Sequence, residues 1–132
     1  MQTVVYSQGE LSCLSVDVIK KLIPNLRNLH ISALTNSNSK TIVADILQCV
    51  HDKGKHLQRL KLSGMSLGDS QITQGICHVL EDAHLLIHLD LSWSKLLPRY
   101  LNSIVKTLAF LDYKNLRNLN LSYNSLVQPP LD

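Results

Sequence analysis

One seven-residue phrase, Leu-x-x-Leu-x-(Leu/Ile)-Ser, occurs four times along the chain at nearly constant spacing. The copies begin at Leu26, Leu57, Leu86 and Leu116, so successive copies stand 31, 29 and 30 residues apart. A period in this range is typical of stacked units, in which each unit buries its apolar side only against its neighbours. The repeat favours a binding role over catalysis.

Each phrase alternates apolar and polar residues, as a short strand with one buried face does. Between the phrases the apolar residues recur at helical spacing. The sequence therefore predicts four strands, each preceded by a helix, and the helices are expected over residues 16–23, 39–51, 69–81 and 98–111.

The ends of these helices carry recognisable signals. The opening helix should end before Pro24. Ser39 suits an N-cap, Asp69 or Ser70 caps the next helix, and Pro98 suits a first turn. Strands separated by a helix on one side must run parallel, so we expect strands on an inner wall and helices on an outer wall. Residues 1–132 should form a single domain.

This pattern resembles the leucine-rich repeat family, in particular its ribonuclease-inhibitor-like subclass with long repeats and a full helix per unit. The resemblance covers residues 15–126 and is strongest over 57–67, 86–96 and 116–126, which match Leu-x-x-Leu-x-Leu-x-x-(Asn/Cys)-x-Leu except at one position. It implies an α/β solenoid of about four repeats, an open arc with parallel strands on the concave face and helices on the convex face.

The Asn/Cys position of that pattern normally bonds loop backbone between repeats. Here it holds Asn124 in the last unit, but Ser94, Met65 and Leu34 in the others. We expect Asn124 to make these bonds and Ser94 to substitute in part. Met65 and Leu34 should leave the backbone groups to water or to each other.

The polar residues of the strands predict a candidate binding face. The phrase leucines must point into the core, so their neighbours form columns across the inner face, where the resemblance also places the usual contact points. The candidate partner-binding residues are Arg59, Lys61, His88, Asp90, Trp93, Asn118, Asn120 and Tyr123.

Two further columns follow the strands. Ser32, Ser63, Ser92 and Ser122 suit a structural role, because small hydroxyls fit a tight strand exit. In the next column, stacking of the units would set Trp93 beside Tyr123 at one rim of the face, where such side chains often dominate binding. Alternatively, Trp93 folds over the following loop and covers Leu96 and Leu97.

No catalytic or metal-binding constellation is evident in the sequence. Asp90 and His88 face the same side of one strand, and we interpret them as a surface ion pair. Replacing either by Ala should then change stability by less than about 0.5 kcal/mol. The histidines lack helical metal-ligand spacing, and Cys49 and Cys77 suit small buried residues even if stacking brings them together. We expect no catalytic residue, no metal and no cofactor.

The composition and net charge limit the kinds of partner that the chain is expected to bind. Only 17% of residues are charged and the net charge is +3, too little for a nucleic-acid footprint. No signal peptide, membrane span or disulfide framework is recognisable, which predicts a cytoplasmic protein with neither a membrane nor a small-molecule substrate as partner.

These observations predict a protein–protein interaction module or a scaffold subunit of an intracellular complex. The alternative is a regulator of an enzyme: a GTPase activator, an inhibitor or a substrate receptor of a ubiquitin ligase. We further expect the chain to belong to a larger protein or assembly. The last strand lacks a polar cap, and Pro129-Pro130 cannot form a covering helix.

Overall fold

The computed structural model describes residues 3–82, 84–111 and 116–124. The end of the predicted repeats at Leu126, and Pro129-Pro130 beyond it, lie outside the described residues. The elements in chain order are β1 (Thr3–Gly9), α1 (Cys13–Leu22), a 3₁₀ turn η1 (Ile23–Asn25), β2 (Asn28–Leu34), α2 (Ser39–Lys53), β3 (Arg59–Ser63), α3 (Ser70–Asp82), β4 (His88–Asp90), α4 (Pro98–Phe110) and β5 (Asn118–Asn120).

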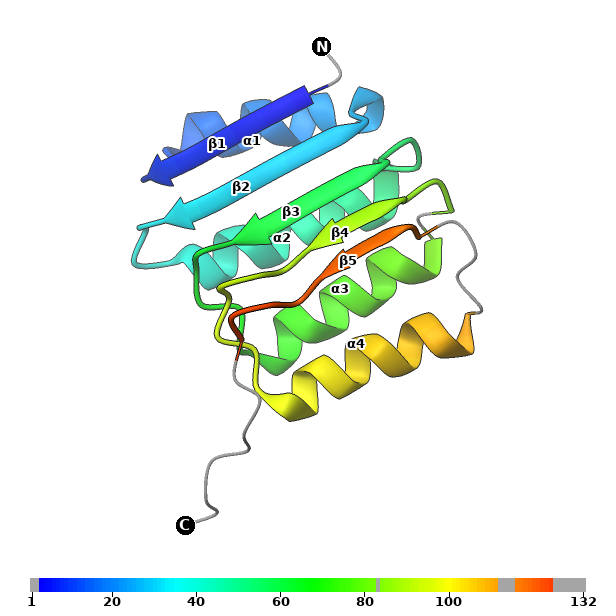
Figure 1. Ribbon diagram of the computed structural model, residues 1–132. Coiled ribbons are helices and arrows are strands. Elements are labelled where there is room, and N and C mark those ends of the chain that lie inside the picture. The colour runs from blue at the N-terminus through cyan, green and yellow to red at the C-terminus, as the bar shows by residue number, and fades with distance from the viewer. Residues whose placement is uncertain (1–2, 83, 112–115, 125–132) are drawn as a thin grey trace.

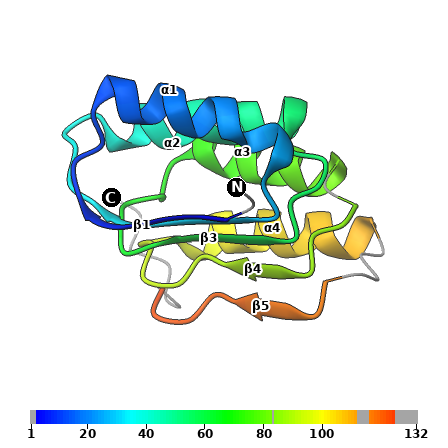
Figure 2. The same ribbon diagram turned by 90° about the horizontal axis from the view of Figure 1, so that it is seen from above.

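The chain is an α/β protein with two layers. The five strands form one parallel sheet in the order β1-β2-β3-β4-β5, so strand order follows chain order. The helices pack on one face of this sheet (Figure 1 and Figure 2). Within the described residues, no helix covers the opposite face, which we call the strand face. The predicted parallel strands and their separation from a helical layer are confirmed.

The four phrases pair in register. Leu29 of β2 lies beside Leu60 of β3, which lies beside Leu89 of β4, and Leu89 lies beside Leu119 of β5. Leu29, Leu60 and Leu89 are almost completely buried, whereas Leu119 is 42% exposed. The predicted inward orientation is confirmed for the first three leucines.

The first strand was not predicted. The sequence predicts a helix as the first element. This is wrong, because β1 precedes α1 and pairs with β2. Val4 lies beside Leu29 and Tyr6 beside Ile31, and both pack against the core. β1 lacks the leucine phrase, so only its β-branched and aromatic residues signal a strand.

The helix starts follow local capping chemistry. Asp69 caps α3, since its Oδ1 accepts hydrogen bonds from the backbone N–H groups of Gln71 (2.8 Å) and Ile72 (3.3 Å). Pro98 begins α4, and α1 ends at Leu22, before Pro24, as predicted. The assignment of Ser39 as an N-cap is wrong, because Ser39 is the first residue of α2 and Asn38 precedes it without a side-chain cap.

Asn124 binds the backbone on two neighbouring units, as predicted. Its Oδ1 accepts from the N–H groups of Ser94 and Leu96, both at 3.0 Å. Its Nδ2 donates to the carbonyls of Leu91 and Leu121, both at 2.9 Å. This single side chain therefore holds the loop that follows β4 against the end of β5.

The other units complete the same position differently. Ser94 is fully buried, and its Oγ lies 3.1 Å from the carbonyl of Leu62, so it replaces part of the asparagine function. Near Met65, whose side chain cannot replace the asparagine, backbone groups of two units bond directly to each other: the Leu67 N–H donates to the Ser94 carbonyl at 2.9 Å. In the first unit, Oδ1 of Asn36 accepts from the Leu11 N–H at 2.7 Å, and its Nδ2 donates to the Leu11 carbonyl at 2.9 Å.

Leu89 and Leu119, which lie side by side but differ in burial, allow a matched pair of substitutions. Leu89→Ala should cost about 2–5 kcal/mol through lost burial and a residual cavity. Leu119→Ala, in the same register position on a half-exposed strand, should cost about 1–2 kcal/mol. Urea melts measure both values, and equal losses would contradict the observed difference in burial.

Candidate functional site

The strand face carries two complete polar rows. One row contains Asn28, Arg59, His88 and Asn118, which lie side by side on β2 to β5. The second row contains His30, Lys61, Asp90 and Asn120. The sequence predicted both rows from alternation alone, and the strand pairing confirms their order.

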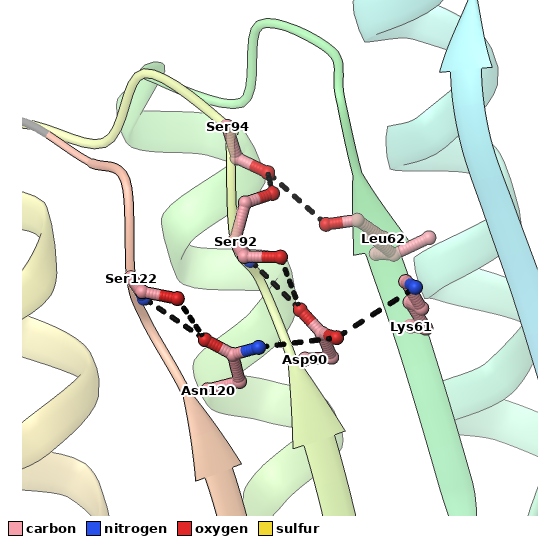
Figure 3. Close-up of polar contacts among 7 residues, drawn as sticks. All are labelled: Lys61, Leu62, Asp90, Ser92, Ser94, Asn120 and Ser122. Carbon is pink, nitrogen blue, oxygen red and sulfur yellow. Dashed lines mark hydrogen bonds and ion pairs between the residues drawn. The ribbon is translucent and has the colours of Figure 1, made fainter.

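Asp90 occupies the centre of a hydrogen-bonded cluster (Figure 3). Its Oδ1 accepts from the backbone N–H of Ser92 at 3.0 Å and from the Ser92 hydroxyl at 2.6 Å. Its Oδ2 lies 3.9 Å from Nζ of Lys61 and accepts from Nδ2 of Asn120 at 3.5 Å. Asp90 thus connects β3, β4 and β5 across the strand face.

The environment of Asp90 keeps it ionised. Burial opposes the charge, but the hydrogen bonds from Ser92 and the charges of Lys61 and His88 outweigh it, so the pKa of Asp90 is below its ordinary value of 3.8. The expectation of a solvated Asp90–His88 ion pair is wrong. Asp90 is only 7% exposed, and its hydrogen-bond partners are Ser92 and Asn120.

The same turn recurs one unit later. Asn120 Oδ1 accepts from both the backbone N–H (3.0 Å) and the hydroxyl of Ser122, as Asp90 does from Ser92. Side chains of this kind commonly fix the backbone two residues on. The hydroxyls of Ser92 and Ser122 are therefore engaged within the fold, which agrees with the structural role predicted for the serine column.

The residue after each of the four serines of the column, Ser32, Ser63, Ser92 and Ser122, adopts a left-handed backbone conformation. φ is +53° at Ala33, +69° at Gly64, +56° at Trp93 and +60° at Tyr123. Only glycine adopts this conformation freely, and a bulky side chain there costs about 1–2 kcal/mol. Two of the four positions nevertheless carry large aromatic residues.

Trp93 and Tyr123 stack on each other. Their ring centroids lie 4.1 Å apart and the ring planes differ by 11°. Trp93 is 59% exposed and Tyr123 is 68% exposed. Of the two arrangements considered for Trp93, the side-by-side one is therefore confirmed, and the indole does not fold away over the following loop.

The strand face also carries basic side chains, namely Arg59, Lys61 and His30. Arg59 is exposed, and its side chain makes no hydrogen bond or ion pair to another described residue, whereas its backbone N–H donates to the Arg27 carbonyl at 3.0 Å. Burial and then the charge of Lys61 lower the pKa of His30, against the weaker effect of Asp90, so this ring is neutral at pH 7. Among the described strands, only β3 carries Lys or Arg, at Arg59 and Lys61.

The helical layer carries polar contacts that hold neighbouring helices together. His51 of α2 lies 2.7 Å from Oδ2 of Asp82 on α3, and Lys20 of α1 lies 3.0 Å from Oδ2 of Asp45 on α2. Within the described part of the chain, no three His, Cys, Asp or Glu side chains form a group suited to a metal ion. These contacts suit helix packing rather than ligand binding.

The cysteines Cys13, Cys49 and Cys77 are free. The Cys49 thiol contacts the carbonyl of Lys20 on α1 at 3.6 Å, and the Cys77 thiol that of Ser103 on α4 at 3.8 Å. The two thiols thus bond to different neighbouring helices. Burial is the main cause that raises the pKa of Cys49, which favours the inert thiol form.

An apolar groove of about 540 Å³ follows α1 and β1. Leu14, Val18 and Val5 are exposed along it, and none of its lining residues is charged. The groove lacks the combination of cation, amide donors and stacked aromatic rings found on the strand face.

No protein-family model matches the chain, and no curated protein matches it at a significant level. Over the described residues, none of the helices combines the length and apolar character that crossing a membrane requires.

The Asp90 cluster predicts a graded series of stabilities. Asp90→Ala should cost about 1–3 kcal/mol, because the buried N–H of Ser92 loses its acceptor. Asp90→Asn should cost less, about 1 kcal/mol, because an amide oxygen serves the same turn at Asn120. His88→Ala, the control on the same strand, should stay within about 0.5 kcal/mol. Urea melts would contradict the cluster if Asp90→Ala matched His88→Ala.

Acid should remove the contribution of the Asp90 charge. The folded-state pKa is depressed, so the carboxylate stabilises the fold above its ordinary value of 3.8 and this stabilisation is lost as the pH falls through the folded-state pKa. The stability difference between the native chain and Asp90→Asn should therefore be full at pH 7 and shrink below about pH 4. Melts over this range test it, and a difference that is independent of pH would refute an ionised Asp90.

Proposed function

We propose that this chain is a protein-recognition module of the leucine-rich repeat type, which binds its partner through the strand face. Support comes from the sheet, whose strands follow chain order and alternate with helices on one side. The recurrent phrase supplies the same buried leucines to successive strands. In this proposal the units form a solenoid, the strand face is its concave side and the helices form its convex side.

The Trp93–Tyr123 stack carries the proposal. Both residues occupy left-handed backbone positions that favour glycine, and both are more than half exposed to water. Backbone strain and exposed aromatic area each cost free energy, and such costs concentrate at functional sites. Trp and Tyr are also among the residues that most often dominate the binding energy of protein interfaces.

The chemistry of the face suits recognition better than catalysis. Asp90 is the one carboxylate that the described strands present, and its two oxygens already face Ser92, Asn120 and Lys61. A general base needs a free oxygen within hydrogen-bond reach of substrate. What the face offers to solvent instead is donor groups of Arg59 and the amides, beside two aromatic rings.

The proposed setting is a scaffold or adaptor role within an intracellular complex. Three free thiols agree with a reducing compartment, where unpaired cysteines persist. A rigid sheet face also holds its side chains in place before binding, which lowers the entropy lost when a partner docks.

Glycine substitution at Trp93 and Tyr123 should remove the aromatic rings while keeping the fold. Because φ is positive at both positions, the double variant Trp93→Gly/Tyr123→Gly should fold normally and lose the aromatic surface. Binding to a partner recovered with the native chain should weaken by about 2–4 kcal/mol. Quantitative affinity capture from the source organism, followed by calorimetry on the recovered partner, measures this change.

Phe110→Ala provides the control, because Phe110 is an exposed aromatic residue on α4 in the helical layer. This variant should bind the partner like the native chain. Loss of binding in Phe110→Ala, with normal binding by the glycine double variant, would move the site to the helices and refute the proposal.

A further inference from the structure

The described strands carry two cations and one carboxylate. Arg59 and Lys61 both lie on β3, the middle strand of the sheet. Apart from Asp90, the described acidic residues lie on helices or in loops, namely Glu10, Asp17, Asp45, Asp52, Asp69, Glu81 and Asp82. The strand face therefore has a cationic centre, whereas on the helices and loops cations and carboxylates occur together.

The negative charge of Asp90 is already balanced. Its Oδ2 faces Lys61 at 3.9 Å, and its Oδ1 accepts both donors of Ser92. Arg59 is left as an exposed cation without a described partner, between Asn28 on β2 and His88 on β4. Lys95, also exposed, follows Trp93 by two residues and extends the cationic character toward the aromatic rim.

The planar fork of an arginine side chain suits a carboxylate, which it binds through two parallel hydrogen bonds. Arg59 and Lys61 are two residues apart on one face of a strand, a separation of about 7 Å. The side chains of residues i and i+2 in an extended peptide have the same separation of about 7 Å. One carboxylate of such a segment can bind Arg59, and a second can reach Lys61, which is partly exposed but contributes less because it also faces Asp90.

We infer that the partner presents an acidic polypeptide segment to the strand face, with carboxylates on Arg59 and Lys61 and an apolar or aromatic side chain over the Trp93–Tyr123 stack. This inference rests on the proposed function and specifies the chemistry of its partner. Arg59 lies between Asn28, whose Nδ2 donates to Thr3 Oγ1 at 3.0 Å and has a second N–H, and the imidazole of His88.

A nucleic acid is the other large polyanion, and the face suits it less well. Proteins that bind a phosphate backbone neutralise several phosphates with Lys and Arg, for example about 6–10. Here β3 provides two cations, one of which already faces Asp90, which is fewer than such a phosphate-binding surface offers. A segment with a few carboxylates and an apolar anchor fits the face more closely.

A random library of displayed 12-residue peptides, selected on the immobilised full chain, tests the inference. Recovered peptides should be rich in Asp and Glu and contain at least one aromatic or aliphatic residue. Arg59→Glu should weaken their binding at least tenfold. Lys106→Glu, which makes the same charge change at an exposed site on α4, should leave the Kd within twofold. The Kd should also rise with salt, as expected for exposed charges.

Several results would overturn the inference. These are recovery of neutral or basic peptides, recovery of no peptide, equal effects of Arg59→Glu and Lys106→Glu, or tighter binding of a 12-nucleotide oligothymidylate than of any peptide. The variant Trp93→Gly/Tyr123→Gly distinguishes the two claims. If it loses peptides that Arg59→Glu retains, the strand face binds and only the acidic chemistry is wrong. If both variants bind like the native chain, the proposed function fails as well.

Discussion

Leu29, Leu60 and Leu89 stand side by side on three neighbouring strands, and each is buried against the helical layer. This in-register packing determines which residues of neighbouring strands lie side by side on the strand face. A slip of one residue between strands would send these leucines to water and the polar residues into the core. Apolar burial thus sets the alignment of Arg59 with His88 and of Lys61 with Asp90, although none of these four residues contributes to the apolar core.

The rim of the face depends on the same alignment through a second set of contacts. Asp90 and Asn120 fix the turns at Ser92 and Ser122, and the next residue of each unit takes a left-handed backbone. Asn124 then bonds the following loop to both units. Because both turns have the same geometry, the rings of Trp93 and Tyr123 emerge in parallel and stack. The stacked aromatic pair is therefore built by backbone geometry that repeats from one unit to the next.

Features with a periodic cause were predictable from the sequence. The strands of the four phrases, the helices between them and the two polar rows follow from alternation and helical spacing, and Asn124 follows from its place in the repeat. β1 was missed because Val4 and Tyr6 do not belong to a leucine phrase and gain their burial only from β2. Helix ends followed capping chemistry at Asp69 but not at Ser39, where the chain offers several similar polar residues in succession.

The details of the site were less accessible, because they depend on contacts between units. The burial of Asp90 arises from Ser92, Lys61 and Asn120, which lie in three different strand segments. No spacing rule distinguishes such a carboxylate from a solvated one. The choice between a stacked and a folded-down Trp93 was also open in the sequence, since it depends on the left-handed turn and on the ring of Tyr123, thirty positions away.

Successive units align so that residues about thirty positions apart become neighbours on one face. Solution NMR on the isotopically labelled chain tests this most directly through nuclear Overhauser effects. The account predicts ring-to-ring effects between Trp93 and Tyr123, together with backbone effects of parallel pairing between Leu60 and Leu89. Effects of antiparallel or shifted pairing for these strands, or an indole of Trp93 in contact with Leu97 and not with Tyr123, would contradict it.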